Sequence, residues 1–166
     1  LMKNFIAIIV APLLFASCVP SYAPPKSGEA TAEISFEGVH PTMFTDGESC
    51  SNPQVIPTEN LPINGKSTPL KIRANKEIAF IGGFTNVENI NSKEVTLSNC
   101  VVAYSFIPAE HQKYKFFVVV KGNTCGGGIL KLSPNGQYET ELAATKREFN
   151  LHPSPGSQVR CSPKQI

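Results

Sequence analysis

Apolar and polar residues alternate along residues 31–37. Ala32, Ile34 and Phe36 alternate with polar neighbours, and Gly38 follows them. A period of two with one polar side is typical of a half-buried antiparallel strand. The pattern therefore predicts a strand that turns one face to a core and the other to solvent.

Two more strands are predicted in the middle of the chain. Residues 70–74 alternate in the same way, and Asn75-Lys76 has the composition of a tight turn into the apolar run 78–81. Gly82-Gly83 follows that run, and glycine inside a strand commonly marks a bulge or an end. We therefore expect the second strand to bulge or stop at these glycines.

The strongest β pattern covers residues 95–120. The runs 95–107 and 114–120 are rich in β-branched and aromatic residues, and Pro108 separates them. Such residues suit the pleated surface of a sheet. Because the stretch 116–120 is apolar on both faces, we expect it to lie in a central strand.

The C-terminal part of the chain has strong turn signals. Ser133-Pro134-Asn135-Gly136 predicts a turn, because proline fixes φ and Asn-Gly tolerates positive φ. Residues 137–142 fit a returning strand, but residues 139–149 also fit a short helix, and the pattern leaves both open. Prolines make the remaining tail irregular.

Short strands, frequent turn residues and the lack of a long amphipathic helix predict an all-β fold. We expect one domain over residues 31–166. Its predicted architecture is an antiparallel β-sandwich of about seven strands, immunoglobulin-like or transthyretin-like, with a Pro-rich tail.

Residues 40–67 fit this scheme poorly. They contain four prolines and only one strand-like run, at residues 54–56. Loops of this length in compact domains are usually functional or contain an unrecognised element. Two interpretations stay open: an edge strand, or a disulfide-tied surface loop that contacts a partner.

The first 18 residues have a different character. Lys3 precedes an apolar stretch over residues 5–15, and the small residues Ala16-Ser17 lead to Cys18. The apolar stretch is shorter than the roughly 20 residues that a membrane-spanning helix needs. This order of charge, apolar run, small residues and cysteine resembles the signal peptide of a bacterial lipoprotein, over residues 2–18.

The resemblance implies that residues 1–17 are removed and that Cys18 carries acyl chains, such as palmitate, that attach the protein to a membrane. In Gram-negative lipoproteins an Asp after the lipidated cysteine resembles an inner-membrane retention signal. Val19 occupies that position here. It implies the outer membrane in such a source, with the domain facing the periplasm or the cell surface. Secretory cleavage after Ser21 and a retained membrane anchor are the alternatives.

Residues 18–30 are rich in proline and small polar residues and show no hydrophobic period. They predict a flexible, extended tether between the membrane and the domain, because Pro-rich chain extends by about 3.1 Å per residue. An ordered arm packed on the domain is the alternative.

The number of cysteines supports lipidation. The chain has five cysteines. If Cys18 is lipidated, Cys50, Cys100, Cys125 and Cys161 remain as an even set that can pair fully. Disulfides persist in the oxidising compartments that exported proteins reach. We therefore expect disulfides at these four positions rather than free thiols.

Four cysteines allow three pairings, and the sequence does not decide among them. Sequential pairing, Cys50 with Cys100 and Cys125 with Cys161, is the leading hypothesis. It would tie the long loop to a core strand and the tail to the glycine-rich segment. A bond between Cys100 and Cys125 would contradict it.

Charge and composition limit the partners. The formal net charge of the chain is +2, and it falls by one if Lys3 leaves with a signal peptide. A near-neutral chain gives no basis for nucleic-acid binding. The expected partners are therefore the membrane, through the acyl chains, and an envelope protein.

Fragments of two phosphate-binding patterns are incomplete. Residues 65–68 match only the end of a phosphate-binding loop, since Asn60 stands where its first glycine belongs and a strand is expected next. Gly126–Gly128 has the composition of an anion-binding nest, but a bulge or tight turn beside a disulfide explains it better.

Candidate catalytic and metal-binding residues are sparse. His40, His111 and His152 lack the spacing of a zinc site. Asp46 is the only Asp in the chain, and no Gly-x-Ser-x-Gly nucleophile motif occurs. We therefore expect no enzymatic activity, no cofactor and no metal.

Two functional hypotheses follow. The first is a lipid-anchored, non-catalytic interaction or structural module of the cell envelope, and the second is a small-ligand-binding lipoprotein. Tyr104 and Tyr114 bear on the first hypothesis, because exposed tyrosines often anchor a partner. At strand spacing they more often lie in the core, which we favour.

Overall fold

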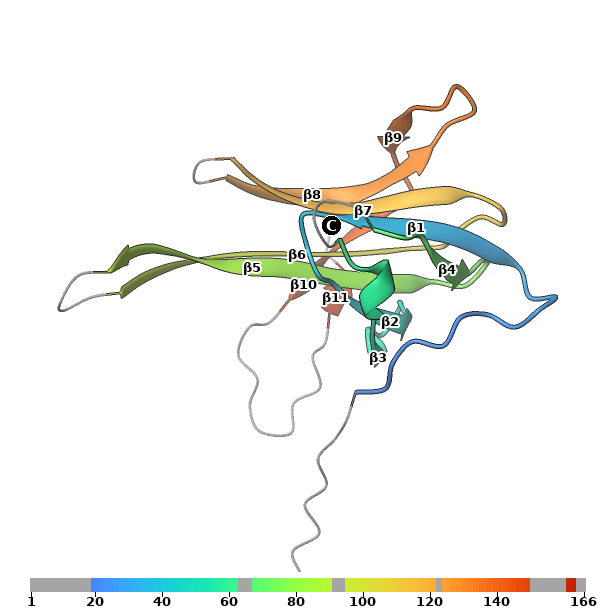
Figure 1. Cartoon of the computed structure of the whole chain (residues 1–166), viewed down its shortest axis with the longest axis horizontal. Helices are drawn as coiled ribbons and strands as arrows, with labels where there is room; N and C mark the ends of the chain where they lie inside the picture. The colour runs from blue at the N-terminus through green and yellow to red at the C-terminus, as the bar shows by residue number, and fades with distance from the viewer. Residues whose placement is uncertain (1–18, 63–66, 91–94, 122–123, 150–160, 164–166) are drawn as a thin grey trace, which may run out of the picture.

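The computed structural model describes residues 19–62, 67–90, 95–121, 124–149 and 161–163, with backbone only for 84–90, 95–99 and 161–163. Two β-sheets face each other in this part of the chain (Figure 1). The strands are β1 (Thr31–Glu37), β2 (Thr42–Asp46), β3 (Ser51–Val55), β4 (Leu70–Arg73), β5 (Ile78–Ile90), β6 (Val95–Phe106), β7 (Lys113–Lys121), β8 (Thr124–Leu132), β9 (Tyr138–Thr140), β10 (Thr145–Phe149) and β11 (Cys161–Pro163). The one described helix is a 3₁₀ turn, η1 (Thr58–Asn60).

The predicted all-β sandwich is confirmed. The structure describes eleven strands rather than about seven, because several short strands carry too few residues to show a period. No helix among the described residues is long and apolar enough to cross a membrane.

The five-stranded sheet has the order β4-β1-β7-β8-β9. The predicted central position of the apolar run is confirmed, since β7 lies between β1 and β8. β1 pairs with β7 in parallel and with β4 antiparallel. The sheet is therefore mixed. The parallel pair needs a long connection between its strands, and residues 38–112 supply it.

The six-stranded sheet has the order β11-β10-β6-β5-β2-β3, and every pairing in it is antiparallel. Its centre is the long hairpin of β5 and β6, visible across the middle of Figure 1. The expectation that β5 stops or bulges at Gly82-Gly83 is wrong. Its ladder with β6 is regular through both glycines and shifts only between Val87 and Asn89.

Gly82 serves the packing between the sheets. A Cβ atom at this position would lie 2.7 Å from Val39 Cγ2 and 2.8 Å from Phe116 Cε1. Such distances are far inside normal contact. The glycine therefore lets the two sheets approach each other instead of ending the strand.

Aromatic side chains fill the space between the sheets. The ring of Phe80 is fully buried and lies 5.6 Å from Phe36 and 5.8 Å from Phe116, between ring centroids. Phe106 and Tyr114 meet edge to face at 4.8 Å. Contacts of this kind add to the hydrophobic stabilisation that burial of the rings supplies.

The C-terminal ambiguity is resolved in favour of strands. The turn at 133–136 is present, with a hydrogen bond from the Gly136 N–H to the Ser133 carbonyl and a positive φ at Gly136. β9 then pairs with β8, and β10 pairs with β6 in the other sheet. Residues 138–149 therefore carry the chain from one sheet to the other, which a helix packed on one sheet would not do.

The prediction of a flexible tether over 18–30 is wrong for its described part, and the ordered arm is observed. Ser21 forms a parallel bridge with Val55, and the ring of Tyr22 is buried in the core. The N–H of Tyr22 donates to the Val55 carbonyl, and the N–H of Val55 donates to the Pro20 carbonyl. Proline lacks a donor but keeps its carbonyl, so a Pro-rich segment can still add to a strand edge.

Candidate functional site

The hairpin of β2 and β3 forms one edge of the six-stranded sheet, and its residues pack against β5 on the outer face of that sheet. Phe44, Cys50 and Ala79 form a small buried cluster there, and Ile81 packs against it. Phe44 lies opposite Ala79 in the ladder, so the cluster lies on the face turned away from Phe80 and the main core. This sheet therefore has buried side chains on both faces.

A buried arginine connects the hairpin to the sheet. The Arg147 guanidinium on β10 donates from Nε to Ser105 Oγ at 2.7 Å and from one terminal nitrogen to the Gly47 carbonyl at 3.2 Å. The same nitrogen lies 2.7 Å from Glu77 Oε1. The planar guanidinium presents several donors in a fixed arrangement, so one side chain can hold three different segments.

The tip of the hairpin is held by the carboxylate of Asp46. It accepts hydrogen bonds from the Ser49 N–H at 3.3 Å and the Ser51 hydroxyl at 3.1 Å. Bonds from Ser49 and then from Ser51 lower the pKa of Asp46, because they stabilise the charged form. Cys50 and Asn52 have positive φ in this turn, a conformation that these hydrogen bonds support.

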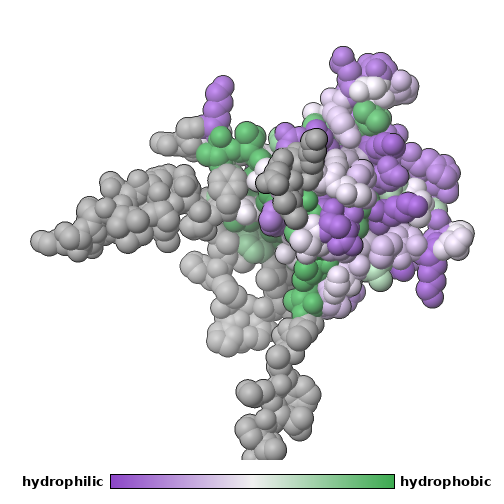
Figure 2. Space-filling view, in the orientation of Figure 1, coloured by the Kyte–Doolittle hydropathy of each residue, from purple (hydrophilic) through white to green (hydrophobic). Residues whose placement is uncertain are grey.

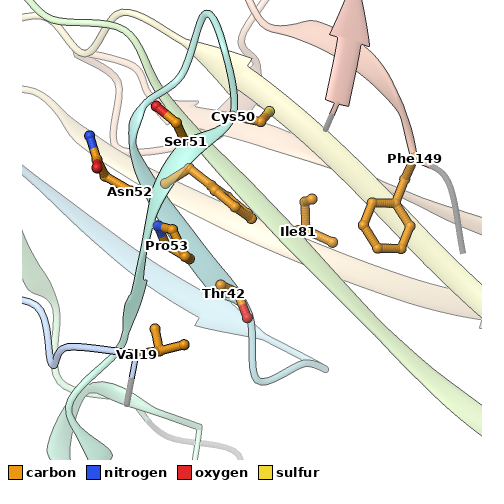
Figure 3. Close-up of a pocket in the computed structure, with 9 residues that line it drawn as sticks. Val19, Thr42, Cys50, Ser51, Asn52, Pro53, Ile81 and Phe149 are labelled. Atoms are coloured by element: carbon orange, nitrogen blue, oxygen red, sulfur yellow. The ribbon is translucent and has the colours of Figure 1, made fainter. Parts of the chain in front are cut away.

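An apolar pocket of about 530 Å³ is lined by residues of β2, β3, β5 and β10 in the six-stranded sheet, together with Cys50 and Val19 (Figure 3). In Figure 3 the ring of Phe149 is directed toward Ile81, with Cys50 at one end of the pocket and Val19 at the other. No lining residue is charged. The lining consists of Val19, Thr42, Phe44, Cys50, Ser51, Asn52, Pro53, Ile81 and Phe149.

The described N-terminal arm starts at this pocket. Val19 lines it, and the bridge between Ser21 and Val55 fixes the arm along β3. Val19 and Val55 are 46% and 52% exposed, respectively, which leaves apolar surface open beside the pocket. Figure 2 shows a hydrophobic area at the lower edge of the domain, on the side where Figure 1 places β2 and β3.

The predicted sequential disulfide pairing is wrong. Cys100 on β6 is bonded to Cys125 on β8, with 5.4 Å between their Cα atoms. The bond joins the two sheets close to Gly127, where an added Cβ would lie 2.9 Å from Val102 Cγ2. Glycine lets β8 and β6 come close enough for the bond, and sequence spacing does not report that distance.

Cys50 is also disulfide-bonded. Its partner is not among the residues whose side chains the structure describes, and Cys18 likewise lies outside them. With Cys100 and Cys125 paired to each other, Cys18 and Cys161 are the two remaining cysteines. The backbone of Cys161 on β11 lies opposite Phe149, which lines the same pocket as Cys50.

The long segment 40–67 contains the edge strand of the first interpretation and one part of the second, a disulfide-bonded cysteine. It contains the edge hairpin of β2 and β3, and its cysteine is disulfide-bonded. Contact with a partner stays a prediction. The strand β2 was not recognised, and Pro53 inside β3 was a further obstacle, since proline is confined to sheet edges and bulges.

The incomplete phosphate-binding patterns have structural explanations. Ser67 accepts a hydrogen bond from the Phe36 N–H and donates to the Phe36 carbonyl, and the strand β4 follows it. Residues 65–66 lie outside the described part. Gly126–Gly128 lies within β8, and its φ angles are not positive, unlike the alternating conformation that a nest needs.

The histidines do not gather in the described structure. His40 is exposed, and His111 lies 3.6 Å from Glu110 with most of its side chain in solvent. His152 lies outside the described residues. Within those residues, no group of three or more His, Cys, Asp or Glu is placed to hold a metal ion.

The preference for a core position is confirmed for Tyr114, and Tyr104 is partly buried against the same core. The Tyr114 hydroxyl accepts a hydrogen bond from the Ala109 N–H at 2.9 Å. Burial raises the pKa of both tyrosines.

Sequence reasoning missed Arg147 and the pocket. The alternation of Thr145, Arg147 and Phe149 with charged neighbours was a usable signal for β10, but the helical interpretation competed with it. No family model, curated protein or solved structure significantly matches the chain, so the site rests on its own geometry.

Proposed function

We propose that this protein is a lipid-anchored, non-catalytic interaction module of the cell envelope. Residues 2–18 supply the lipoprotein-like signal, and Cys18 supplies the acylation site. The observation that carries the proposal is the position of Val19, which lies beside an apolar pocket and an exposed hydrophobic edge. An anchor attached next to such an edge places apolar surface near the lipid.

The cysteines support an exported location. Cys100 and Cys125 form a disulfide, and Cys50 forms another. Disulfides are rare in reducing compartments and persist in the periplasm and at cell surfaces. If Cys18 is acylated, Cys161 is the only cysteine left to pair with Cys50, which makes the disulfide map a test of acylation.

The ordered arm changes how the module would sit. Hydrogen bonds hold Pro20 and Tyr22 to Val55, so no free spacer separates Val19 from the domain. A domain anchored at Cys18 would therefore lie directly on the membrane, with the edge formed by β3 nearest the lipid. A protein partner would then meet the remaining surfaces of the sandwich.

Intact mass of the membrane-extracted protein tests the anchor. The expected result is a chain that begins at Cys18, carries acyl groups and contains two disulfides, Cys100–Cys125 and Cys50–Cys161. Cys18→Ser should remove the acyl mass and release the protein from the membrane fraction. A chain that starts after Ser21, or a Cys18–Cys50 disulfide, would reject the proposal.

Crosslinking in the native envelope tests the interaction role. A photoreactive residue at Leu142, which is 91% exposed, should capture one defined envelope protein. The same probe at Val119, on another part of the surface, maps whether capture depends on position. Capture of the same abundant neighbours from both positions would count against a specific interaction module.

Small-ligand binding is the second candidate, because the pocket volume favours it. A volume of about 530 Å³ falls within the roughly 300–1,000 Å³ typical of ligand sites. The apolar, uncharged lining would select an apolar molecule. Native mass spectrometry of the purified protein would reveal a bound small molecule under this alternative.

A further inference from the structure

The pocket on the six-stranded sheet has the chemistry of a lipid-binding site. Phe44, Ile81 and Phe149 contribute apolar surface from three different strands, and none of the lining residues carries a charge. Polar atoms come only from Thr42, Ser51 and Asn52 among the side chains. A ligand with a carboxylate or phosphate would meet no opposite charge inside the pocket, whereas a hydrocarbon chain would contact the apolar side chains that line it.

The N-terminal arm reaches this pocket at Val19. Val19 is part of the lining, and Cys18 is the residue that precedes it in the sequence. The arm has no slack, because Pro20 and Tyr22 are both hydrogen-bonded to Val55. Burial of the Tyr22 ring in the core fixes the arm further.

We propose that one acyl chain of lipidated Cys18 occupies the apolar pocket that β2, β3, β5 and β10 line in the six-stranded sheet. The inference rests on the proposed function, since it requires acylation of Cys18. It gives the hairpin a role, because Phe44, Cys50 and Pro53 line the same apolar pocket as Val19. The other acyl chains of the anchor remain available for the bilayer.

The proposal explains two features together. The pocket has an apolar lining, which favours hydrocarbon over water. It also lies on the outer face of its sheet, away from the main core, where an attached chain can enter from the surface. An acyl chain linked to Cys18 is present at high effective concentration at this site, so it competes well against free lipid.

Photocrosslinking with a labelled fatty acid tests the proposal in the full-length protein. Cells that express it are fed a fatty acid that carries a diazirine along the chain and a terminal alkyne, and their membranes are irradiated. The expected result is an intramolecular adduct between the acyl chain on Cys18 and residues Phe44, Ile81 or Phe149. Peptide mapping by mass spectrometry locates the adduct.

A pocket-filling variant supplies the specific control. Thr42 lines the pocket but is exposed, so Thr42→Trp adds bulk there with little effect on the core. It should cause loss of the pocket adducts while the label on Cys18 remains. Leu142→Trp places the same residue at an exposed position outside the pocket and should keep the adducts. Ile81→Phe is the second filling variant, and formation of the Cys100–Cys125 bond checks folding.

The outcomes separate this inference from the proposed function. A protein without label on Cys18 would reject both. A labelled Cys18 whose adducts lie only on phospholipid, on a second copy of the chain or elsewhere on the domain would reject the occupant and leave the anchor intact. Pocket adducts that persist in both filling variants would also reject it.

Discussion

The outer faces of the two sheets are built from different chemistry. On the five-stranded sheet, Lys115 lies 2.8 Å from Glu37 and over the ring of Tyr138, and Lys113 lies 3.6 Å from Glu33. On the six-stranded sheet, the corresponding face carries a buried apolar cluster, a buried arginine and a pocket. The first outer face is in contact with solvent, whereas on the second face residues of the β2–β3 hairpin pack against β5.

The difference shows where interaction with an apolar group is favoured. Exposed ion pairs such as Lys113 with Glu33 contribute little to stability, and they give the outer face of their sheet a charged surface. The hairpin of β2 and β3 buries apolar surface outside the main core, and it leaves a pocket next to the N-terminal arm. The apolar surface on which the proposed lipid contact depends therefore lies on the six-stranded side.

The largest expected effect comes from a buried aromatic residue of the β2–β3 hairpin. Phe44→Ala removes a side chain that is only 3% exposed, and such truncations cost about 3–5 kcal/mol of unfolding free energy. Phe117→Ala, on the half-buried outer face of the five-stranded sheet, should cost about 1 kcal/mol. Urea denaturation measures both, and equal losses would contradict the contrast.

A second contrast compares the buried cation of Arg147 with the partly exposed cation of Lys115. Arg147→Ala leaves Ser105 and Glu77 without their partner, and breaking such a buried pair costs about 3 kcal/mol. Lys115→Ala should cost less than about 1 kcal/mol, because its pair with Glu37 faces solvent.

The Arg147→Lys variant sharpens this test. Lysine keeps the charge but loses the fixed arrangement of donors that reaches both Ser105 and the Gly47 carbonyl. Thermal melting should place it between the wild type and Arg147→Ala. A lysine variant as stable as the wild type would show that charge alone holds the hairpin.

The core that the two sheets share should lose stability in strong base, because three tyrosines lie in it or against it. Burial raises the pKa of Tyr22, Tyr104 and Tyr114 above the ordinary value of 10.0. The folded protein then binds these protons more tightly than the unfolded chain does, so the contribution of these tyrosines to stability is constant below that pH and falls as pH rises above it. Tyrosine absorbance and circular dichroism should change together in a single transition. Tyrosine ionisation well before unfolding would contradict this.

The smallest expected effect is local and appears in acid. Hydrogen bonds from Ser49 and Ser51 lower the pKa of Asp46 below its ordinary value of 3.8. The contribution of this carboxylate is present above that value and is lost as pH falls below it. Amide exchange at Ser49, corrected for the intrinsic pH dependence, should accelerate there before exchange in β7 does. Simultaneous acceleration would show that the hairpin does not open on its own.

The sequence was most informative where a strand has a clear pattern of its own. Residues 31–37, with one polar face, were predicted as a strand with the bounds that β1 has, and residues 116–120, apolar on both faces, were placed in a central strand, as β7 is. The turn at 133–136 was also recovered. In each case the information is local, since alternation and turn chemistry are properties of neighbouring residues.

The candidate site was recovered only in part. Cysteine parity predicted disulfides, but the pairing of Cys100 with Cys125 depends on the distance between two sheets. The arm at 19–30 looked like a tether because prolines conceal an edge pairing that needs only carbonyl groups and a few N–H donors. Arg147 was not singled out, because its role depends on three partners that are distant in the sequence.

The sequence by itself determined the all-β class and the positions of several principal strands, and the resemblance of residues 2–18 to a lipoprotein signal stays a prediction. Only the tertiary structure decided the parallel pairing of β1 with β7, the bond between the sheets, the docking of the arm and the pocket beside Val19. Strand patterns follow from contacts between neighbouring residues. A pocket arises where segments distant in the chain converge, and no local pattern records that convergence.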